Sequence, residues 1–226
     1  MKVFILAGGY GKRLRPLTNK IPKPLIMLDD KPIIEWQIQW LKSNNINSFV
    51  IGLGYLKHKL ISHFKKENHN VEYVVETEPL GTGGAIKNAE DILKNEEKFM
   101  VINGDIITNL DCSKLFLSKN DLVSMALVPL KSPYGVIKTR NSRVVEFREK
   151  PVLKGYWLNA GIYLMSKKIF NYLPEKGDVE KLFQELALKN RINGVKFTNI
   201  YWRSIDSIKD MEEGSLDLKL KKIYTL

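Results

Sequence analysis

The chain begins MKVFILAGGYGKRLRPLTNKIPKPL (residues 1–25), and this segment is the most informative part of the sequence about the fold. The apolar run at 2–6 is typical of a buried strand. Three glycines follow it, and then a cluster of arginine and lysine side chains. Glycine lets backbone N–H groups approach a ligand closely, and Arg and Lys bind anionic oxygens. The segment therefore predicts a strand that ends in an anion-binding loop.

Apolar runs alternate with segments of helical periodicity through the first half of the chain. The apolar runs predict buried strands at 2–6, 48–53, 71–76 and 99–105. The segments between them predict helices at 32–44, 57–66 and 83–94. Such alternation is typical of a parallel sheet covered on both faces, which binds ligands at the carboxyl ends of its strands. The glycine loop and the tripeptide NGD (103–105) both fall at such ends.

The pattern changes after residue 121, where strands joined by turns are expected to dominate. Strands are predicted at 122–130, 134–151 (with a hairpin around Asn141), 156–165, 194–201 and 202–206. Helices are predicted at 167–173, 179–190 and 207–222. Since the sequence contains no internal repeat, low-complexity tract or long linker, we expect a single domain over 1–226.

The composition is that of a globular protein, with 44% hydrophobic and 27% charged residues among 226. No apolar run approaches the roughly 20 residues that span a bilayer, and the N-terminal run is too short for a signal peptide. Cys112 is the only cysteine, so no internal disulfide can form. We expect a soluble, cytoplasmic protein without a membrane partner.

The net charge of +11 favours either an anionic partner or a solvated, lysine-rich surface. The positive residues are scattered along the chain. No dense Lys/Arg block with interleaved aromatic residues is present, although a nucleic-acid groove would require one. The sequence therefore predicts no nucleic-acid partner.

Two common phosphate-binding motifs do not match the glycine loop. A P-loop has glycine at the position of Leu6 and Ser or Thr at the position of Arg13. A dinucleotide-binding fingerprint has its third glycine where Leu14 stands. The pattern that is present is L-x-G-G-x-G-x-R-L-x-P-L-T (6–18), followed by P-K-P (22–24).

This pattern resembles the signature of the sugar-1-phosphate nucleotidylyltransferases, also called nucleotide-sugar pyrophosphorylases. The resemblance continues in EPLGTGGA (78–85), NGD (103–105), YGVI (134–137), FREKP (147–151) and NAGIY (159–163). It implies an α/β fold, a three-layer Rossmann-like nucleotidyltransferase sandwich with a mixed, mainly parallel central sheet. It also implies a nucleotide-binding half at 1–120 and a sugar-binding half at 121–226. We expect no C-terminal β-helix.

The reaction that the resemblance implies joins a nucleoside triphosphate to a sugar 1-phosphate and releases pyrophosphate, with Mg²⁺ as the cofactor. Its catalytic residues would be Arg13, Lys23 and Asp105, and Asp105 and Asp206 would bind the metal. The nucleotide would be bound by Leu6, Ala7, Gly8, Gly9, Gly11, Lys12, Glu78, Pro79, Gly81, Thr82 and Gly83. The sugar phosphate would be bound by Gly135, Glu149, Lys150, Asn159 and Gly161.

The second metal ligand departs from the common family pattern W-x-D-x-G-T. This chain has Ser204 at the usual carboxylate position and Asp206 two residues later. A shift of two along a strand keeps the same face, so Asp206 is expected to reach the metal. The competing interpretation of Asp206 is an N-cap for the last helix.

The base and the sugar are the open points of the sequence interpretation. Glu76 or Glu78 could accept the N1–H and N2–H₂ donors of guanine, and EPLGTGGA most resembles guanylyltransferases for mannose or heptose phosphates. The leading hypothesis is GDP-mannose synthesis from GTP and mannose 1-phosphate by a monomer or homodimer. The alternatives are a UTP-, dTTP- or CTP-dependent glucose-1-phosphate nucleotidylyltransferase and a catalytically inactive, nucleotide-sugar-binding regulatory subunit.

Overall fold

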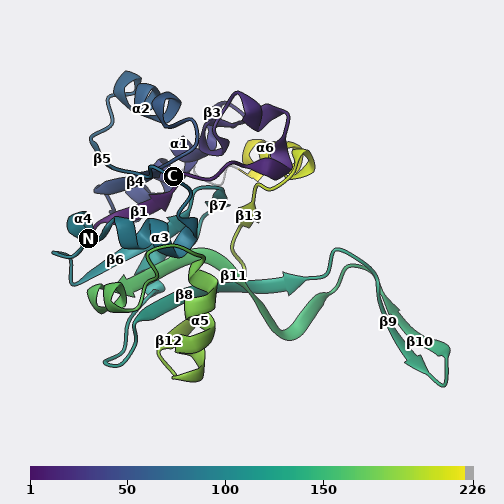
Figure 1. Ribbon diagram of the computed structural model, residues 1–226. Helices are drawn as coiled ribbons and strands as arrows, with labels where there is room; N and C mark the ends of the chain where they lie inside the picture. Colours follow the sequence, from purple (N-terminus) through teal and green to yellow (C-terminus); the bar gives the residue numbers. More distant parts are fainter. Residues whose placement is uncertain (222–226) are drawn as a thin grey trace.

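A seven-stranded sheet forms the centre of the protein (Figure 1). The structure is a computed structural model that describes residues 1–221. In spatial order the strands are β12 (Ile192–Lys196), β8 (Val123–Lys131), β11 (Val152–Ser166), β6 (Lys98–Asn103), β1 (Val3–Leu6), β4 (Phe49–Leu53) and β5 (Val71–Val75). Only β11 runs antiparallel to its neighbours, so within the described residues the sheet is mixed and mainly parallel, as expected.

Helices cover both faces of this sheet and give the three layers that were expected. Within the described residues the helices are α1 (Ile33–Ser43), α2 (Lys57–Lys66), α3 (Gly81–Asn88), α4 (Glu90–Leu93), α5 (Val179–Leu188) and α6 (Ile208–Lys221). Val3 and Ile5 of β1 pack with α1 and α2 in one core, whereas Phe4 packs with α3, α4 and α5 in another. This alternation follows from the period of two in a strand, because successive side chains point to opposite faces.

Short 3₁₀ helices and two-residue strands fill the segment between β1 and α1. They are η1 (Lys12–Leu14), η2 (Leu17–Asn19), η3 (Lys23–Leu25), β2 (Met27–Leu28) and β3 (Lys31–Pro32). A third small core packs Leu14 and Leu28 of this segment against Ile205 and Leu218 near the end of the chain. This core holds the basic N-terminal segment beside the C-terminal helix α6.

A two-stranded sheet links the two halves of the chain. β13 (Trp202–Ser204) was expected within 202–206, and it pairs antiparallel with β7 (Ile106–Thr108), which the sequence analysis did not anticipate. The expected strand at 194–201 is shorter, since β12 ends at Lys196. The chain then leaves the large sheet, and the Thr108 hydroxyl donates to the Tyr201 carbonyl at 2.7 Å.

Several expected helices have different bounds. The helix at 83–94 begins earlier, at Gly81, and breaks at Ala89, whose N–H donates to the Ile86 carbonyl three residues back instead of continuing the i−4 ladder. The segment at 167–173 forms the 3₁₀ helix η5 (Lys167–Asn171), and η4 (Cys112–Lys114) was not expected. The expected helix at 207–222 is α6, and residue 222 lies outside the described residues.

The expected hairpin around Asn141 projects from the body as an arm (Figure 1). It consists of β9 (Val136–Arg140) and β10 (Arg143–Arg148), which pair only with each other in the part of the chain that the structure describes. We call residues 132–151 the arm. None of the helices found in residues 1–221 is both long and apolar enough to cross a bilayer.

The burial of Cys112 predicts an unreactive thiol in the folded protein. Burial, and next the nearby Asp111 carboxylate, raise the pKa of Cys112 to about 12, so the thiolate is scarce at pH 8. We expect a thiol reagent at pH 8 to label the native chain only as fast as it unfolds, and to label denatured chain at once. The exposed variant Lys119→Cys is the control and should label rapidly. Fast labelling of native Cys112 would contradict this burial.

Candidate active site

The glycine loop sits where the carboxyl ends of four neighbouring parallel strands meet. β1 ends at Leu6, which is in register with Gly52 of β4 and Asn103 of β6. The connections after β1, β4, β5 and β6 therefore open at one edge of the sheet, as ligand-binding loops of such sheets do.

Two glycines allow these connections to touch. A Cβ on Gly8 would lie 2.8 Å from the Glu76 Oε1 atom, and a Cβ on Gly104 would lie 2.5 Å from the Leu6 carbonyl oxygen. The Gly104 N–H donates to that carbonyl at 3.0 Å. A side chain at position 104 would push its loop away from β1, whereas one at position 8 would displace the Glu76 carboxylate.

Arg13 reaches the site because the chain turns sharply at Gly11. Gly11 has φ +59°, which is unfavourable for most L-residues, and the Thr18 hydroxyl donates to its carbonyl at 2.9 Å. The turn starts η1, where Leu14 is buried and Arg13 is mostly exposed. The backbone at Arg13 is therefore anchored by its buried neighbour, and its exposed guanidinium is accessible to an anionic ligand.

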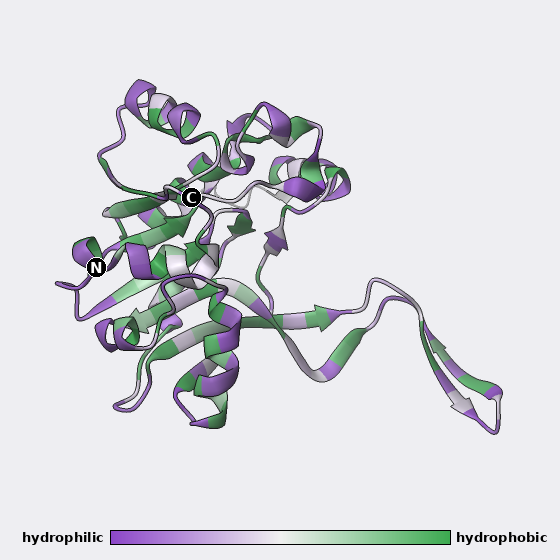
Figure 2. Ribbon diagram, in the orientation of Figure 1, coloured by the Kyte–Doolittle hydropathy of each residue, from purple (hydrophilic) through white to green (hydrophobic). Residues whose placement is uncertain are grey.

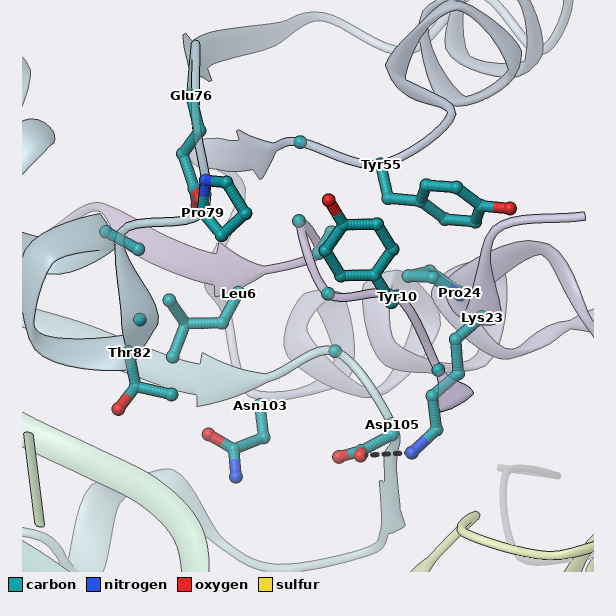
Figure 3. A pocket seen from close by; sticks show the side chains of 18 of the residues that line it. Leu6, Tyr10, Lys23, Pro24, Tyr55, Glu76, Pro79, Thr82, Asn103 and Asp105 are labelled. Atoms are coloured by element: carbon teal, nitrogen blue, oxygen red, sulfur yellow. Dashed lines mark hydrogen bonds and ion pairs between the residues drawn. The ribbon is translucent and has the colours of Figure 1, made fainter. Parts of the chain in front are cut away.

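The centre of the site is a lysine held between two aspartates (Figure 3 shows the first pair). Lys23 Nζ lies 2.5 Å from Asp105 Oδ2 and 2.9 Å from Asp206 Oδ1. Arg13 Nη2 lies 2.8 Å from the same Asp206 oxygen. The structure thus brings together the three predicted catalytic residues and the predicted second metal ligand, although Lys23 and Asp206 alone are 183 residues apart in the sequence.

Asp206 is held as a carboxylate by its surroundings. Burial opposes ionisation, but the hydrogen bonds from Lys23 and the Ser204 hydroxyl, together with the Lys23 and Arg13 charges, lower the pKa of Asp206. The Asp206 N–H donates to Asp210 Oδ2 at 3.1 Å. Ser204, which stands at the common family position of the carboxylate, thus supports the carboxylate two residues later.

One oxygen of Asp105 is available for a ligand. Among the described residues, the buried Oδ1 atom of Asp105 has no hydrogen-bond partner, and buried polar atoms without partners are uncommon. The same part of the chain has no cluster of three or more His, Cys, Asp or Glu side chains that could hold a metal. A cation here would therefore have two protein carboxylates, Asp105 and Asp206, and further oxygens from substrate or water.

Gln37 fixes the turn that carries Asp105, and the sequence analysis did not identify it. This buried side chain of α1 donates from Nε2 to the Asn103 carbonyl at 2.8 Å and to the Ile106 carbonyl at 3.0 Å. The two bonds bracket the turn between β6 and β7. No sequence motif marks Gln37. The helical period places it on the buried face of α1 and does not predict which carbonyls it binds.

A cavity of about 610 Å³ extends from this centre over the glycine loop (Figure 3). The predicted nucleotide-binding residues that line it are Leu6, Ala7, Gly8, Gly9, Gly11, Lys12, Glu78, Pro79, Gly81 and Thr82. Gly83 is buried away from the lining and its N–H donates to the Gly177 carbonyl. The Thr82 hydroxyl accepts from the Val179 N–H and donates to Glu180, so it also holds the first turn of α5.

The structure separates the two glutamates that the sequence left open as base ligands. Glu76 is half-buried in the cavity wall, where burial raises its pKa and the Leu80 N–H works in the opposite direction. Glu78 is exposed and pairs with Lys176 at 2.6 Å. Glu76 is therefore the better placed acceptor for a base inside the cavity.

Two tyrosines that were not predicted from the sequence, Tyr10 and Tyr55, line the cavity. The rings of Tyr10 and Tyr55 lie 4.9 Å apart at the side of the cavity (Figure 3). Lys57 and Asp178 also line it without having been predicted. Tyr10 occupies a variable position of the glycine signature, and Tyr55 follows a strand without any motif of its own.

The predicted sugar-phosphate ligands fall into two groups. Gly161 of β11 has φ +69° and lies against the Asn103 side chain, which lines the cavity, and its N–H donates to Asn159 Oδ1 at 3.0 Å. Gly135, Glu149 and Lys150 lie instead on the arm, and none of them lines the cavity. The structure therefore does not bring all five together in one chain.

A mixed α/β sheet with a cavity at its strand ends, a glycine loop, and a lysine–arginine–carboxylate centre define an enzyme that handles phosphorylated substrates. The chain belongs to the nucleotidyl transferase family, whose profile matches residues 2–219. The expected membership of the sugar-1-phosphate nucleotidylyltransferases, and the expected enzyme class, are thereby confirmed.

Several characterised relatives cover most of the chain. It is 38% identical over 195 residues to a D-glycero-α-D-manno-heptose 1-phosphate guanylyltransferase from Aneurinibacillus thermoaerophilus, covering 82% of this chain and 84% of that protein. A protein of the same description from Campylobacter jejuni is 37% identical over 89% of this chain and 93% of its own length. A mannose-1-phosphate guanyltransferase from Yarrowia lipolytica is 36% identical over 95% of this chain, which spans only 63% of that relative.

Solved structures agree with the fold. HddC from Yersinia pseudotuberculosis superposes with a TM-score of 0.74 at 29% identity, covering 96% of this chain and 99% of that one. The same Yersinia protein has been solved in complex with GMP-PN. A glucose-1-phosphate thymidylyltransferase-like protein from Bacillus anthracis has a TM-score of 0.75 at 22% identity over 96% and 94% of the two chains, a likeness of fold alone.

Replacing Gln37 should disturb the turn that carries Asp105. Gln37→Leu keeps the apolar stem but removes the side-chain donor from the Asn103 and Ile106 carbonyls, at a cost of about 1–3 kcal/mol in the free energy of unfolding. Misplacement of Asp105 should also lower kcat for nucleotidyl transfer by about 10- to 100-fold. Lys42→Ala, at an exposed position of the same helix, is the control and should change neither. A variant with normal kcat would show that Gln37 does not position Asp105.

Proposed function

We propose that this protein transfers a guanylyl group from GTP to a sugar 1-phosphate of the manno configuration and releases pyrophosphate. The observation that carries the proposal is the centre of Arg13, Lys23, Asp105 and Asp206 at the end of a cavity walled by the glycine loop and Glu76. The named relatives that are described as guanylyltransferases for heptose 1-phosphate or mannose 1-phosphate support the choice of GTP.

The chain's own residues supply charge neutralisation and positioning. In the proposed reaction a phosphate oxygen of the sugar 1-phosphate attacks the α-phosphorus of GTP, the bond to the β-phosphate breaks, and pyrophosphate leaves. Such a step needs in-line placement and neutralisation of the leaving charge more than covalent help. The exposed Arg13 guanidinium would neutralise the leaving phosphates, while Lys23, only 14% exposed, would lie beside the reacting phosphates.

The site also fits a magnesium ion. Mg²⁺ prefers one or two carboxylates plus substrate phosphates and water, and Asp105 and Asp206 offer such a pair with the unpartnered Asp105 Oδ1 atom. Once bound there, Mg²⁺ would neutralise negative charge on the phosphates. Lys23 bridges the two carboxylates in this structure, so its ammonium would be released toward the phosphates as the carboxylates turn to the ion.

Glu76 is proposed to select guanine. Guanine presents two neighbouring donors, N1–H and N2–H₂, that a single carboxylate can accept, and the Glu76 carboxylate faces Gly8 inside the cavity wall. Adenine has no such pair on that edge. The Tyr10 and Tyr55 rings add an aromatic surface at the other side of the glycine loop.

Two sugar phosphates are candidates. Mannose 1-phosphate is the substrate expected from the sequence, and relatives described as acting on it cover 95% of this chain. The heptose 1-phosphate relatives match the length of this chain better, because the alignment covers 84% and 93% of their own sequences. An inactive regulatory subunit is disfavoured by the presence of Arg13, Lys23 and Asp105 together.

A substrate grid tests the proposal. With Mg²⁺ present, we expect pyrophosphate release from GTP and not from CTP, UTP, dTTP or ATP, with mannose, glucose, N-acetylglucosamine and heptose 1-phosphates as acceptors. The active acceptor identifies the sugar. Lys23→Ala should lower kcat by at least about 100-fold, because it removes a buried charge beside the reacting phosphates, whereas the exposed Lys66→Ala should not. A grid without any pyrophosphate release would overturn the proposal.

Glu76 and Glu78 form a matched pair for testing base selection. Glu76→Gln should lower kcat/KM for GTP by about 10- to 100-fold, since the loss of one carboxylate acceptor for two donors is worth roughly 1–3 kcal/mol. Glu78→Gln should leave kcat/KM within about twofold, because Glu78 is solvent-exposed and ion pairs of exposed side chains contribute little. Equal effects of the two substitutions would contradict the assignment of Glu76.

A further inference from the structure

The arm is long, exposed and separate from the body of its own chain. Every residue from 138 to 150 is solvent-exposed, and no residue of the arm lines the cavity. Figure 1 shows β9 and β10 projecting away from the sheet. Such a segment contributes nothing to the core of its own chain, so we expect it to contact another molecule.

One face of the arm is apolar. Ile137 lies opposite Phe147, and Thr139 lies opposite Val144, so these side chains share a face by the period of two. Phe147 and Val144 are each 63% exposed. The other face carries charged residues: Lys138, Arg140, Arg143, Glu146 and Arg148. Figure 2 shows hydrophobic segments along the arm, far from the core.

The apolar face of the β9–β10 hairpin requires a partner that buries it. An isolated two-stranded hairpin is marginally stable in water, because two strands alone bury little apolar surface. An exposed apolar face bordered by charge is typical of a surface that contacts another protein.

The root of the arm extends the main sheet instead of returning to the cavity. Lys131 of β8 pairs with Val152 of β11, and the Ser132 N–H donates to the Pro151 carbonyl at 2.9 Å. Val152 pairs with Lys131 and Asn159 pairs with Leu127, four positions along β8, so the ladder holds Val152 roughly 13 Å from Asn159. Reaching its own cavity would require these ladder bonds to break.

The arm nevertheless carries three of the five predicted sugar-phosphate ligands, gathered at one place. A Cβ on Gly135 would lie 2.8 Å from the Phe147 ring and 3.2 Å from Glu149 Oε2. Lys150 Nζ lies 3.8 Å from Glu149 Oε1. A carboxylate and an ammonium group beside a glycine can bind a sugar phosphate. They do so only when the other residues of a binding site lie next to them.

We propose that the arm closes the active site of a second copy of this chain, so that Glu149 and Lys150 of one copy bind the sugar phosphate held by the cavity of the other. The proposal rests on the proposed function for the identity of the ligand. A two-fold arrangement satisfies both needs at once, because each copy gives its arm and receives one. It covers the Ile137–Phe147 face and brings Lys150 to the sugar side of a cavity that its own chain leaves open.

Complementation between two inactive variants tests the exchange. Lys23→Ala disables the cavity and Lys150→Ala disables the arm, which should lower kcat/KM about 10- to 100-fold by removal of one charged contact. In heterodimers purified by two different tags, the Lys150→Ala copy has an intact cavity and receives an intact arm. We expect about half of the wild-type activity, since one of two sites is complete. Lys154→Ala, an exposed cation beyond the arm, is the control and should be active alone.

The outcomes separate this proposal from the proposed function. No recovery in the heterodimer, although Lys150→Ala alone is impaired, would show that each arm serves its own chain and would overturn the exchange. Full activity of Lys150→Ala alone would also overturn it. If the wild-type protein has no activity in the substrate grid, the proposed function fails, and the exchange is then decided by light scattering: a wild-type dimer that Phe147→Asp converts to a folded monomer supports it, and a wild-type monomer overturns it.

Discussion

The ammonium group of Lys23 between Asp105 and Asp206 is the interaction that the site depends on. Two carboxylates this close repel each other unless a cation lies between them. Lys23 supplies that cation and links the N-terminal loop, the end of the central strand β6 and the segment before α6. The small core of Leu14, Leu28, Ile205 and Leu218 brings these segments together by apolar packing, and the ion pairs then fix their relative position.

Positive and negative charge are placed at this centre in different ways, and the difference bears on chemistry. The backbone that carries the carboxylates is anchored: Gln37 binds the turn at Asp105, and the Asp206 N–H donates to Asp210. Arg13, in contrast, is 75% exposed on the short helix η1. An anchored acidic pair defines where a cation binds, and an exposed guanidinium is accessible to the charge that develops on departing phosphates.

Most strands, the glycine loop and the charged residues around Lys23 were predicted from short sequence motifs. Buried strands and anion-binding loops both produce recognisable patterns within a few neighbouring positions. Gln37, Tyr55 and the β7–β13 pairing could not be predicted, since each depends on a contact between distant segments. The break of the helix at Ala89 is of the same kind, as alanine is an excellent helix former and only tertiary packing interrupts the ladder there. The choice between Glu76 and Glu78 likewise required the depth of the cavity wall.

The hairpin around Asn141 shows the limit most clearly, because its strands were predicted but its direction was not. A sequence motif reports which side chains a ligand needs, and it does not report which chain brings them. The motifs predict that Gly135, Glu149 and Lys150 bind the sugar phosphate, yet none of these residues lines the cavity of its own chain. Phosphate chemistry on a rigid sheet edge and sugar contacts on an exchanged arm would make the complete site a property of two chains, so that sugar recognition would depend on protein concentration while nucleotide binding would not.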